Sequence, residues 1–114
     1  MTIKIYGLKN CDQCKKAIKT LKEAEKDFVF VDIREDADLA TKVPEWLGAV
    51  GVKTILNTRS TTWRGLSDEE KAQADGDDLA KLLQDNPTLI KRPVIEADGE
   101  VMFGWNKENE LALV

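Results

Sequence analysis

Two cysteines, Cys11 and Cys14, are the residues whose type and spacing give this chain its clearest chemistry. Their Cys-x-x-Cys spacing is about one helical turn, so the two sulfurs can meet in a disulfide and supply an attacking and a resolving thiol. The sequence contains no histidine, which excludes a Ser-His-Asp triad, a Cys-His dyad and an imidazole metal ligand. Two cysteines alone cannot complete a tetrahedral zinc site, so we expect no metal.

The elements expected around the cysteine pair would stabilise a thiolate. Residues 2–6 alternate in the manner of a strand, and the apolar spacing over 14–26 predicts an amphipathic helix, with Asn10 and Asp12 as candidate N-caps. Unpaired N–H groups and the dipole at a helix N-terminus favour an anion, so they favour the thiolate of Cys11. This setting favours redox or nucleophilic chemistry over the alternative, in which free cysteines are small core residues.

The charge of the chain is distributed unevenly around the cysteines. The net charge is −4, yet residues 1–26 hold seven lysines and three acidic residues, whereas residues 27–114 are strongly acidic. Lys9, Lys15 and Lys16 flank the pair, and without an imidazole the activation of a thiol must come from lysines, arginines or the helix dipole. An acidic chain binds nucleic acid and anionic lipid poorly, and no apolar run approaches the roughly 20 residues of a membrane span. We therefore expect a cytoplasmic protein that binds neither nucleic acid nor membrane.

Strand and helix signals continue along the rest of the sequence. The β-branched and aromatic run over 28–33 predicts a strand buried on both faces, as in a parallel sheet, which completes a right-handed strand-helix-strand unit. Residues 93–96 and 100–103 flank Ala97-Asp98-Gly99, which predicts a hairpin. The helix signals are an apolar face over 43–50 stopped by Gly51, a capping box at Ser67 and Glu70, leucines over 79–83 before Asn86-Pro87, and a closing segment at 107–113.

A family resemblance is carried by residues 6–12, 15–17, 56–64, 90–93 and 103–106. These segments resemble the ArsC/Spx superfamily of thioredoxin-like proteins, which includes glutaredoxin-linked arsenate reductases. The resemblance covers almost the whole chain, and its most specific parts are the Asn-Thr-Arg block at 57–59 together with the Lys-Arg-Pro block at 91–93. Within the superfamily the sequence is most similar to the YffB type, small proteins regarded as glutathione-dependent thiol reductases.

The resemblance implies a fold that composition and periodicity alone do not reveal. It implies an α/β, thioredoxin-like four-stranded mixed sheet with flanking helices and a helical insertion between strands 2 and 3. A single ArsC-like domain would span 1–114, with residues 1–37 and 88–114 as the thioredoxin-like core and residues 38–87 as the helical insertion. Pro93 matches a proline that this fold places in cis beside the active cysteine.

The resemblance also implies a set of site residues. Cys11 matches the nucleophile, and Cys14 would resolve the mixed disulfide that Cys11 forms. The residues expected to bind substrate or anionic groups are Arg92, Arg59, Lys15, Asn10 and Pro93.

Three departures weaken the resemblance to arsenate reductases in particular. Lys15 stands where those enzymes carry an arginine, which keeps the charge but loses the bidentate fork. Strict alignment places Asn57 at a second arginine position, with Arg59 two residues later as its replacement, and Gly104 occupies the third. Because a tetrahedral oxyanion needs several convergent forks, a glutathione carboxylate or a mixed disulfide fits this sequence better.

The sequence therefore predicts a thiol-disulfide oxidoreductase that binds no cofactor and uses glutathione as co-substrate. Its expected partner is glutathione or a glutaredoxin-like protein, and we expect a monomer. The first alternative is a Spx-like redox-sensing regulator, because Spx proteins share the Cys-x-x-Cys, Thr-Arg-Ser and Arg-Pro segments and bind RNA polymerase. The second alternative is an arsenate reductase.

Overall fold

The computed structural model describes residues 3–73 and 78–113. Contacts within the chain divide it into two compact units. The first unit combines Met1–Ala37 with Arg92–Val114, and the second is Asp38–Lys91. Each unit has its own architecture.

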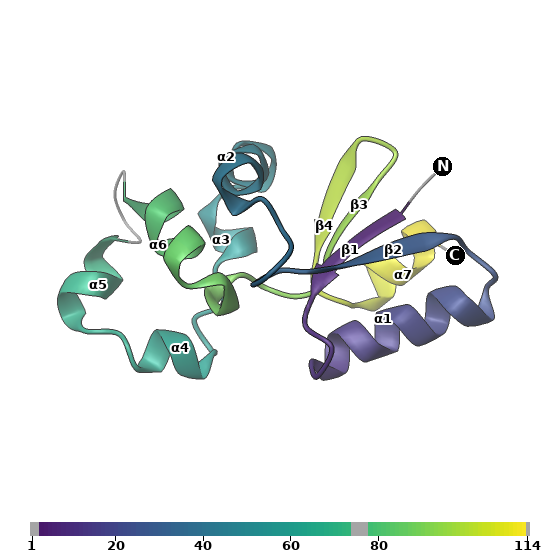
Figure 1. Ribbon diagram of the computed structural model, residues 1–114, viewed down its shortest axis with the longest axis horizontal. Helices are drawn as coiled ribbons and strands as arrows, with labels where there is room; N and C mark the ends of the chain where they lie inside the picture. Colours follow the sequence, from purple (N-terminus) through teal and green to yellow (C-terminus); the bar gives the residue numbers. More distant parts are fainter. Residues whose placement is uncertain (1–2, 74–77, 114) are drawn as a thin grey trace. The chain divides into compact units, whose positions relative to one another are not determined.

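The first unit is built on a four-stranded mixed sheet (Figure 1). Its strands lie in the order β2-β1-β3-β4, with β1 and β2 parallel and the other two pairs antiparallel. The chain leaves the sheet after β2 and returns to it at β3, with helices between, so the expected mixed sheet with a helical insertion between strands 2 and 3 is confirmed. The strands are β1 (Ile3–Gly7), β2 (Phe28–Asp32), β3 (Val94–Ala97) and β4 (Glu100–Phe103).

Helices α1 (Asp12–Glu23) and α7 (Lys107–Leu113) pack on one face of this sheet (Figure 1). The buried residues of α1 are Cys14, Ala17 and Leu21, whose spacing places them on one side of the helix. The expected helix over 14–26 thus exists, but it begins and ends earlier in the chain. The buried cluster between the two helices and the sheet includes residues of both and consists of Ile3, Ile5, Leu21, Ile95, Ala97 and Leu113.

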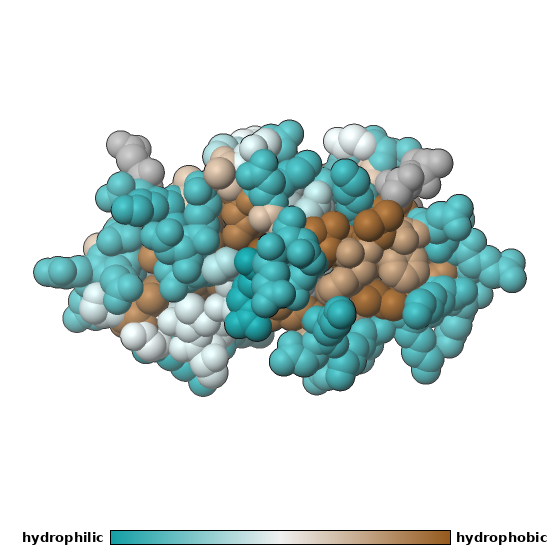
Figure 2. All heavy atoms as spheres, viewed as in Figure 1, coloured by the Kyte–Doolittle hydropathy of each residue, from teal (hydrophilic) through white to brown (hydrophobic). Residues whose placement is uncertain are grey.

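Strand β2 differs from the expectation of burial on both faces, which is wrong. It lies at the edge of the sheet next to β1, and none of its five residues is fully buried. Phe28 and Phe30 pack partly against the core, whereas Val29 is 49% exposed. Figure 2 accordingly shows hydrophobic colouring on the surface in the region of β2. An apolar run predicts a strand but cannot tell an edge position from a central one.

The C-terminal part of the first unit contains a tight turn between β3 and β4 and a side-chain contact that holds α7. Asp98 and Gly99 join β3 to β4 with φ angles of +53° and +78°, so the expected hairpin is confirmed. The Nδ2 of Asn109 in α7 then donates hydrogen bonds to the backbone oxygens of Phe103 and Gly104, at 3.2 and 2.9 Å. These bonds fix α7 to the end of β4.

The second unit contains short helices around the buried side chains of Val43, Trp46, Ile55, Leu82 and Leu83. The predicted stop at Gly51, with φ +81°, and the predicted capping box at Ser67 and Glu70 are both confirmed. Among the described residues no helix has the length and apolarity to cross a bilayer. The helices are α2 (Leu39–Val50), α3 (Val52–Ile55), α4 (Thr61–Arg64), α5 (Asp68–Ala72), α6 (Leu79–Asp85) and the 3-10 turn η2 (Pro87–Leu89).

Candidate active site

Cys11 occupies the N-cap of α1. Its φ and ψ of −88° and 123° are extended, and its backbone oxygen accepts the first helical hydrogen bond, from the N–H of Lys15 at 2.9 Å. The expected caps at Asn10 and Asp12 are therefore wrong, since Asn10 lies before the cap and Asp12 is the first helical residue. The side chain of Cys11 consequently sits at the positive end of the helix dipole, where an anion is stabilised.

Cys14 lies in the first turn of the same helix, but the environment of its thiol differs from that of Cys11. Its side chain is fully buried, whereas that of Cys11 is partly exposed, and both are free thiols. Cys14 can be buried here because Gly7, the last residue of β1, has no side chain. A Cβ on residue 7 would occupy the space that the Cys14 sulfur fills. The site thus offers one accessible thiol and one enclosed thiol, side by side at the start of a helix.

The pKa of Cys11 lies below its ordinary value of 9.0. Partial burial raises the pKa, but the backbone N–H of Cys14, the thiol of Cys14 and the guanidinium of Arg92 all stabilise the thiolate and together outweigh burial. Cys11 is therefore the thiol suited to attack.

The pKa of Cys14 moves the other way, to about 12. Burial is the largest cause, and the neighbouring Cys11 raises it further, while the backbone of Leu8 and the charge of Arg92 lower it. Cys14 is consequently a neutral thiol at physiological pH, and in the reduced site it acts as a hydrogen-bond donor to Cys11.

Arg92 and Pro93 reach the cysteines through the register of the sheet. β3 runs antiparallel to β1 with Val94 opposite Tyr6, so the residues just before β3 arrive beside the last residue of β1. Arg92 lies there half-buried, and the peptide bond to the buried Pro93 is cis, which confirms the expected cis proline. The structure therefore brings Arg92 and Pro93 together with the cysteine pair.

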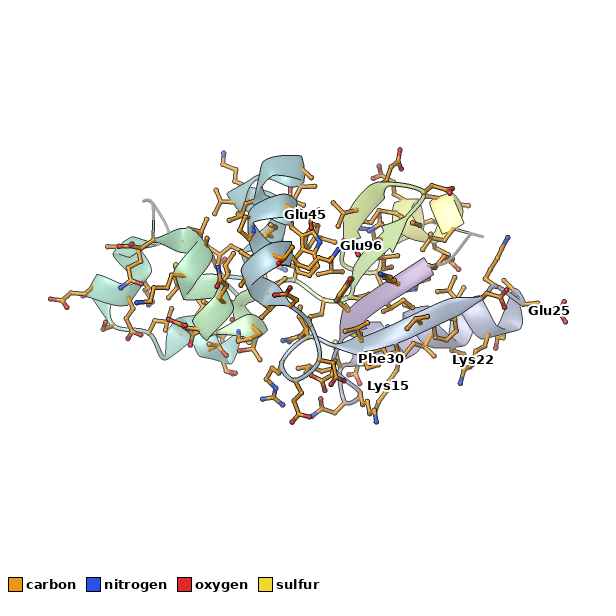
Figure 3. All side chains as sticks on the ribbon, turned by 45° about the horizontal axis from the view of Figure 1, so that its top comes forward. Lys15, Lys22, Glu25, Phe30, Glu45 and Glu96 are labelled. Atoms are coloured by element: carbon orange, nitrogen blue, oxygen red, sulfur yellow. The ribbon has the colours of Figure 1, made fainter. Side chains whose placement is uncertain are left out.

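The remaining expected binding residues are Asn10, Lys15 and Arg59. Asn10 and Lys15 lie directly beside the cysteines in sequence, and both are exposed. Lys15 and Lys22 project from α1 away from the sheet (Figure 3). Arg59 belongs to the second unit, where it is exposed and its backbone N–H donates to the Oδ1 of Asn57 at 3.1 Å. Its role at the cysteines remains a prediction.

Gly7 is a site residue that the sequence reading did not single out. Its only sequence signal is its position, a glycine at the end of a strand four residues before Cys11. Within the described residues there is no group of three or more metal-ligating side chains.

Comparison with known families and curated proteins adds a wider context to this geometry. The model of the ArsC family matches residues 6–113. An uncharacterized protein of Haemophilus influenzae is 38% identical over 106 residues, which cover 93% of each chain. The global transcriptional regulator Spx of Staphylococcus epidermidis is 27% identical over 109 residues, covering 93% of this chain and 82% of the regulator.

Two solved structures are similar along nearly the whole chain. A protein described as YFFB is 32% identical, with a TM-score of 0.86 and 97% of both chains covered. An arsenate reductase (ArsC) related protein from Brucella melitensis is 34% identical, with a TM-score of 0.78, covering 98% of this chain and 93% of that one. The similarity therefore extends well beyond the cysteine motif.

Proposed function

Because the chain belongs to the ArsC family, we propose that it is a thiol-disulfide oxidoreductase whose nucleophile is Cys11. The observation that carries the proposal is the accessible thiol of Cys11 at a helix N-terminus, with its pKa lowered by Cys14 and Arg92 against the opposing effect of burial. A thiolate, rather than a thiol, attacks a disulfide sulfur. The lowered pKa thus raises the reactive fraction of Cys11 at neutral pH.

The proposed reaction consists of two thiol-disulfide exchanges. In the first, the Cys11 thiolate attacks one sulfur of a disulfide RSSR, forming a mixed disulfide and releasing RS⁻, which takes a proton from solvent. In the second, another thiolate attacks the Cys11 sulfur of the mixed disulfide, a new disulfide to Cys11 forms, and the second RS⁻ leaves and takes a proton from solvent. Two electrons pass in total from two thiols to RSSR, which becomes two RSH.

Cys14 is the proposed source of the second thiolate, and its surroundings indicate when it can act. In the reduced site its pKa of about 12 keeps it protonated, partly because Cys11 is next to it. Once Cys11 is bonded to substrate it no longer carries a charge, so that part of the effect disappears. Burial still opposes ionisation, so an external thiol competes with Cys14 for the mixed disulfide.

Glutathione is the proposed co-substrate, both as the external thiol and as the group held in the mixed disulfide. It carries carboxylates at both ends, which suits the positive charges of Arg92 and Lys15 beside Cys11. Asn10 and Pro93 adjoin the cysteines and are proposed to contact its backbone. Arg59 is proposed on the resemblance alone, as a second contact for a carboxylate.

A regulator is the second candidate function, supported by the similarity to Spx. The same cysteine pair would then be a redox switch on a protein that binds RNA polymerase, and it would be oxidised once rather than turned over. The activated Cys11 suits both functions. Catalytic turnover and polymerase binding are therefore the properties that separate them.

Arsenate reduction is the third candidate, supported by the similarity to the Brucella protein. An arsenate ion near Cys11 would need several converging guanidinium groups. Lys15 and Gly104 stand at two positions where the resemblance to arsenate reductases places arginines. The loss of these two guanidinium groups favours a disulfide substrate over arsenate.

The test is glutathione-dependent reduction of hydroxyethyl disulfide by the wild type, Cys11→Ser and Cys14→Ser, with and without arsenate. We expect Cys11→Ser to abolish turnover and arsenate to support none. Full activity in Cys11→Ser would overturn the proposal. Activity retained in Cys14→Ser would assign resolution to external glutathione, and polymerase capture without any turnover would favour the regulator.

A further inference from the structure

Gly7 lies at a point where the fold leaves no room for a side chain. It is the last residue of β1, it is buried, and a Cβ placed on it would collide with the Sγ of Cys14. The same Cβ would lie 3.4 Å from the Cβ of Cys14 and 3.7 Å from the Cε2 of Phe30, which are ordinary contacts. Of these three neighbouring atoms, the Sγ of Cys14 is therefore the one that leaves no room for a Cβ at residue 7.

Backbone conformation does not explain this glycine. Among the glycines that the structure describes, those with a positive φ are Gly51, Gly99 and Gly104, and Gly7 is not one of them. Those three, and the helical Gly48, have nothing within 4 Å of an added Cβ. Gly7 thus differs from them, because the absence of its side chain leaves room for a neighbouring side chain. The other glycines either adopt a positive φ or face open space.

The space over Gly7 determines where the Cys14 sulfur can be. At this position the Cys14 thiol helps to lower the pKa of Cys11, and the backbone of Leu8, the residue after Gly7, acts to lower the pKa of Cys14. A side chain at residue 7 would force the sulfur to rotate away or would lift the first turn of α1. Either movement separates the two sulfurs of the pair.

We propose that Gly7 is a positioning residue, which holds the Cys14 sulfur within reach of Cys11 by leaving room for it over the end of β1. Its consequence for catalysis rests on the proposed function, whereas its effect on the two thiols does not. In the step concerned, the Cys14 thiolate attacks the Cys11 sulfur of the mixed disulfide, the Cys11–Cys14 bond forms, and RS⁻ leaves and is protonated by solvent. No further oxidant is needed, because RSSR is the oxidant: its first RS⁻ left when the mixed disulfide formed, and its second leaves in this step.

The test compares four proteins: the wild type, Gly7→Ala, Cys14→Ala and the double variant. Gly48→Ala is the matched control, because it adds the same methyl group at an exposed helical position with open space. Three properties are measured in each: the thermal midpoint of unfolding, the Cys11 titration by thiolate absorbance, and, where Cys14 is present, closure of the Cys11–Cys14 disulfide after reaction with hydroxyethyl disulfide.

We expect Gly7→Ala to raise the Cys11 pKa, to lower the thermal midpoint, and to slow closure by on the order of tenfold to a hundredfold, as displacement of a reacting group by about 1 Å does. In the Cys14→Ala background, Gly7→Ala should leave the Cys11 pKa unchanged. It should also lower the thermal midpoint much less than it does in the wild-type background, because the Cys14 sulfur is absent. Gly48→Ala should leave the Cys11 pKa and disulfide closure unchanged and should raise the thermal midpoint slightly, because alanine replaces glycine within a helix.

Two results would overturn the proposal. One is wild-type closure in Gly7→Ala, and the other is an equal effect of Gly7→Ala on Cys11 and on stability with and without the Cys14 sulfur. If Gly7→Ala does not fold, folding of the double variant supports the proposal and its failure to fold contradicts it. If Cys11→Ser retains turnover, the proposed function fails, yet the titration and stability comparisons still decide the role of Gly7.

Discussion

The guanidinium of Arg92 lowers the pKa of Cys11, both by hydrogen bonding to the thiolate and by its charge, although the two residues are far apart in the sequence. The antiparallel register of β1 and β3, with Val94 opposite Tyr6, brings the two residues together. A chain without histidine needs another source of positive charge for its thiolate. Here the sheet supplies that charge.

Arg92→Gln is expected to raise the Cys11 pKa and to slow disulfide exchange at neutral pH. A hydrogen bond to a charged group is worth about 1.5–3 kcal/mol, and partial exposure of Cys11 places the loss near the lower end, or about tenfold in rate. The measurement is the pH dependence of exchange with hydroxyethyl disulfide. Arg92→Lys should recover part of the rate, because it restores the charge without the planar fork.

Arg34→Gln is the matched control for that substitution. Arg34 is an exposed arginine of the same unit, in the turn after β2, where its backbone N–H donates to Asp32 at 2.8 Å. Its side chain is not among the groups that lower the Cys11 pKa. An equal change of the pH profile in both variants would contradict the role assigned to Arg92.

The stability of the protein is expected to fall at alkaline pH because of Cys14. Its folded pKa of about 12 lies above the ordinary 9.0, so the stability it contributes is complete below pH 9 and is lost as the pH rises toward 12. The slope is at most about 1.4 kcal/mol per pH unit for one group. Urea unfolding at pH 8 and pH 10.5 measures it, and Cys14→Ala should remove this component. An identical pH dependence in both proteins would contradict the assignment.

Lys15→Gln is expected to weaken the reaction with anionic disulfides while leaving neutral ones nearly unaffected. Lys15 is exposed, so its contribution is about 0.5 kcal/mol, or roughly twofold in kcat/KM for oxidised glutathione at low salt. Lys22→Gln is the matched control, at the far end of α1 and also pointing away from the sheet (Figure 3). Equal losses in both variants would show that general charge, rather than the position of Lys15, matters.

Leu21→Ala tests the packing that holds α1 on the sheet. Leu21 is fully buried in the cluster with Ile5 and Ile95, so its truncation should cost about 2–5 kcal/mol of unfolding free energy. Leu111 in α7 is 69% exposed, and Leu111→Ala should stay within about 0.5 kcal/mol of the wild type. Similar losses in the two variants would argue against this packing of α1.

Local sequence signals predicted the features that depend on neighbouring residues. The buried face of α1, the Asp98-Gly99 turn and the Ser67 capping box each follow from residues a few positions apart. The short helix α4 (Thr61–Arg64) escaped prediction because a single turn has no apolar period to detect. Its N-cap, Ser60, accepts a hydrogen bond from the N–H of Trp63 and was the one available signal.

Features that depend on strand order could not be predicted from local sequence patterns. The apolar run of β2 fits a central strand as well as the edge strand that it forms. The contact between Gly7 and the Cys14 sulfur requires the exact placement of α1 against β1, which no spacing rule supplies. Family resemblance, rather than periodicity, pointed to Arg92 and to the cis proline after it, because both depend on how β3 meets β1.

The activated thiol of Cys11 is the central claim, and the pH dependence of its alkylation tests that claim most directly. Iodoacetamide modification of the wild type is followed as a function of pH, with the modified cysteine identified by mass spectrometry. We expect modification at Cys11, with a midpoint below its ordinary 9.0, while the buried Cys14 remains unmodified. A midpoint at or above 9.0, or modification of Cys14 first, would contradict the account.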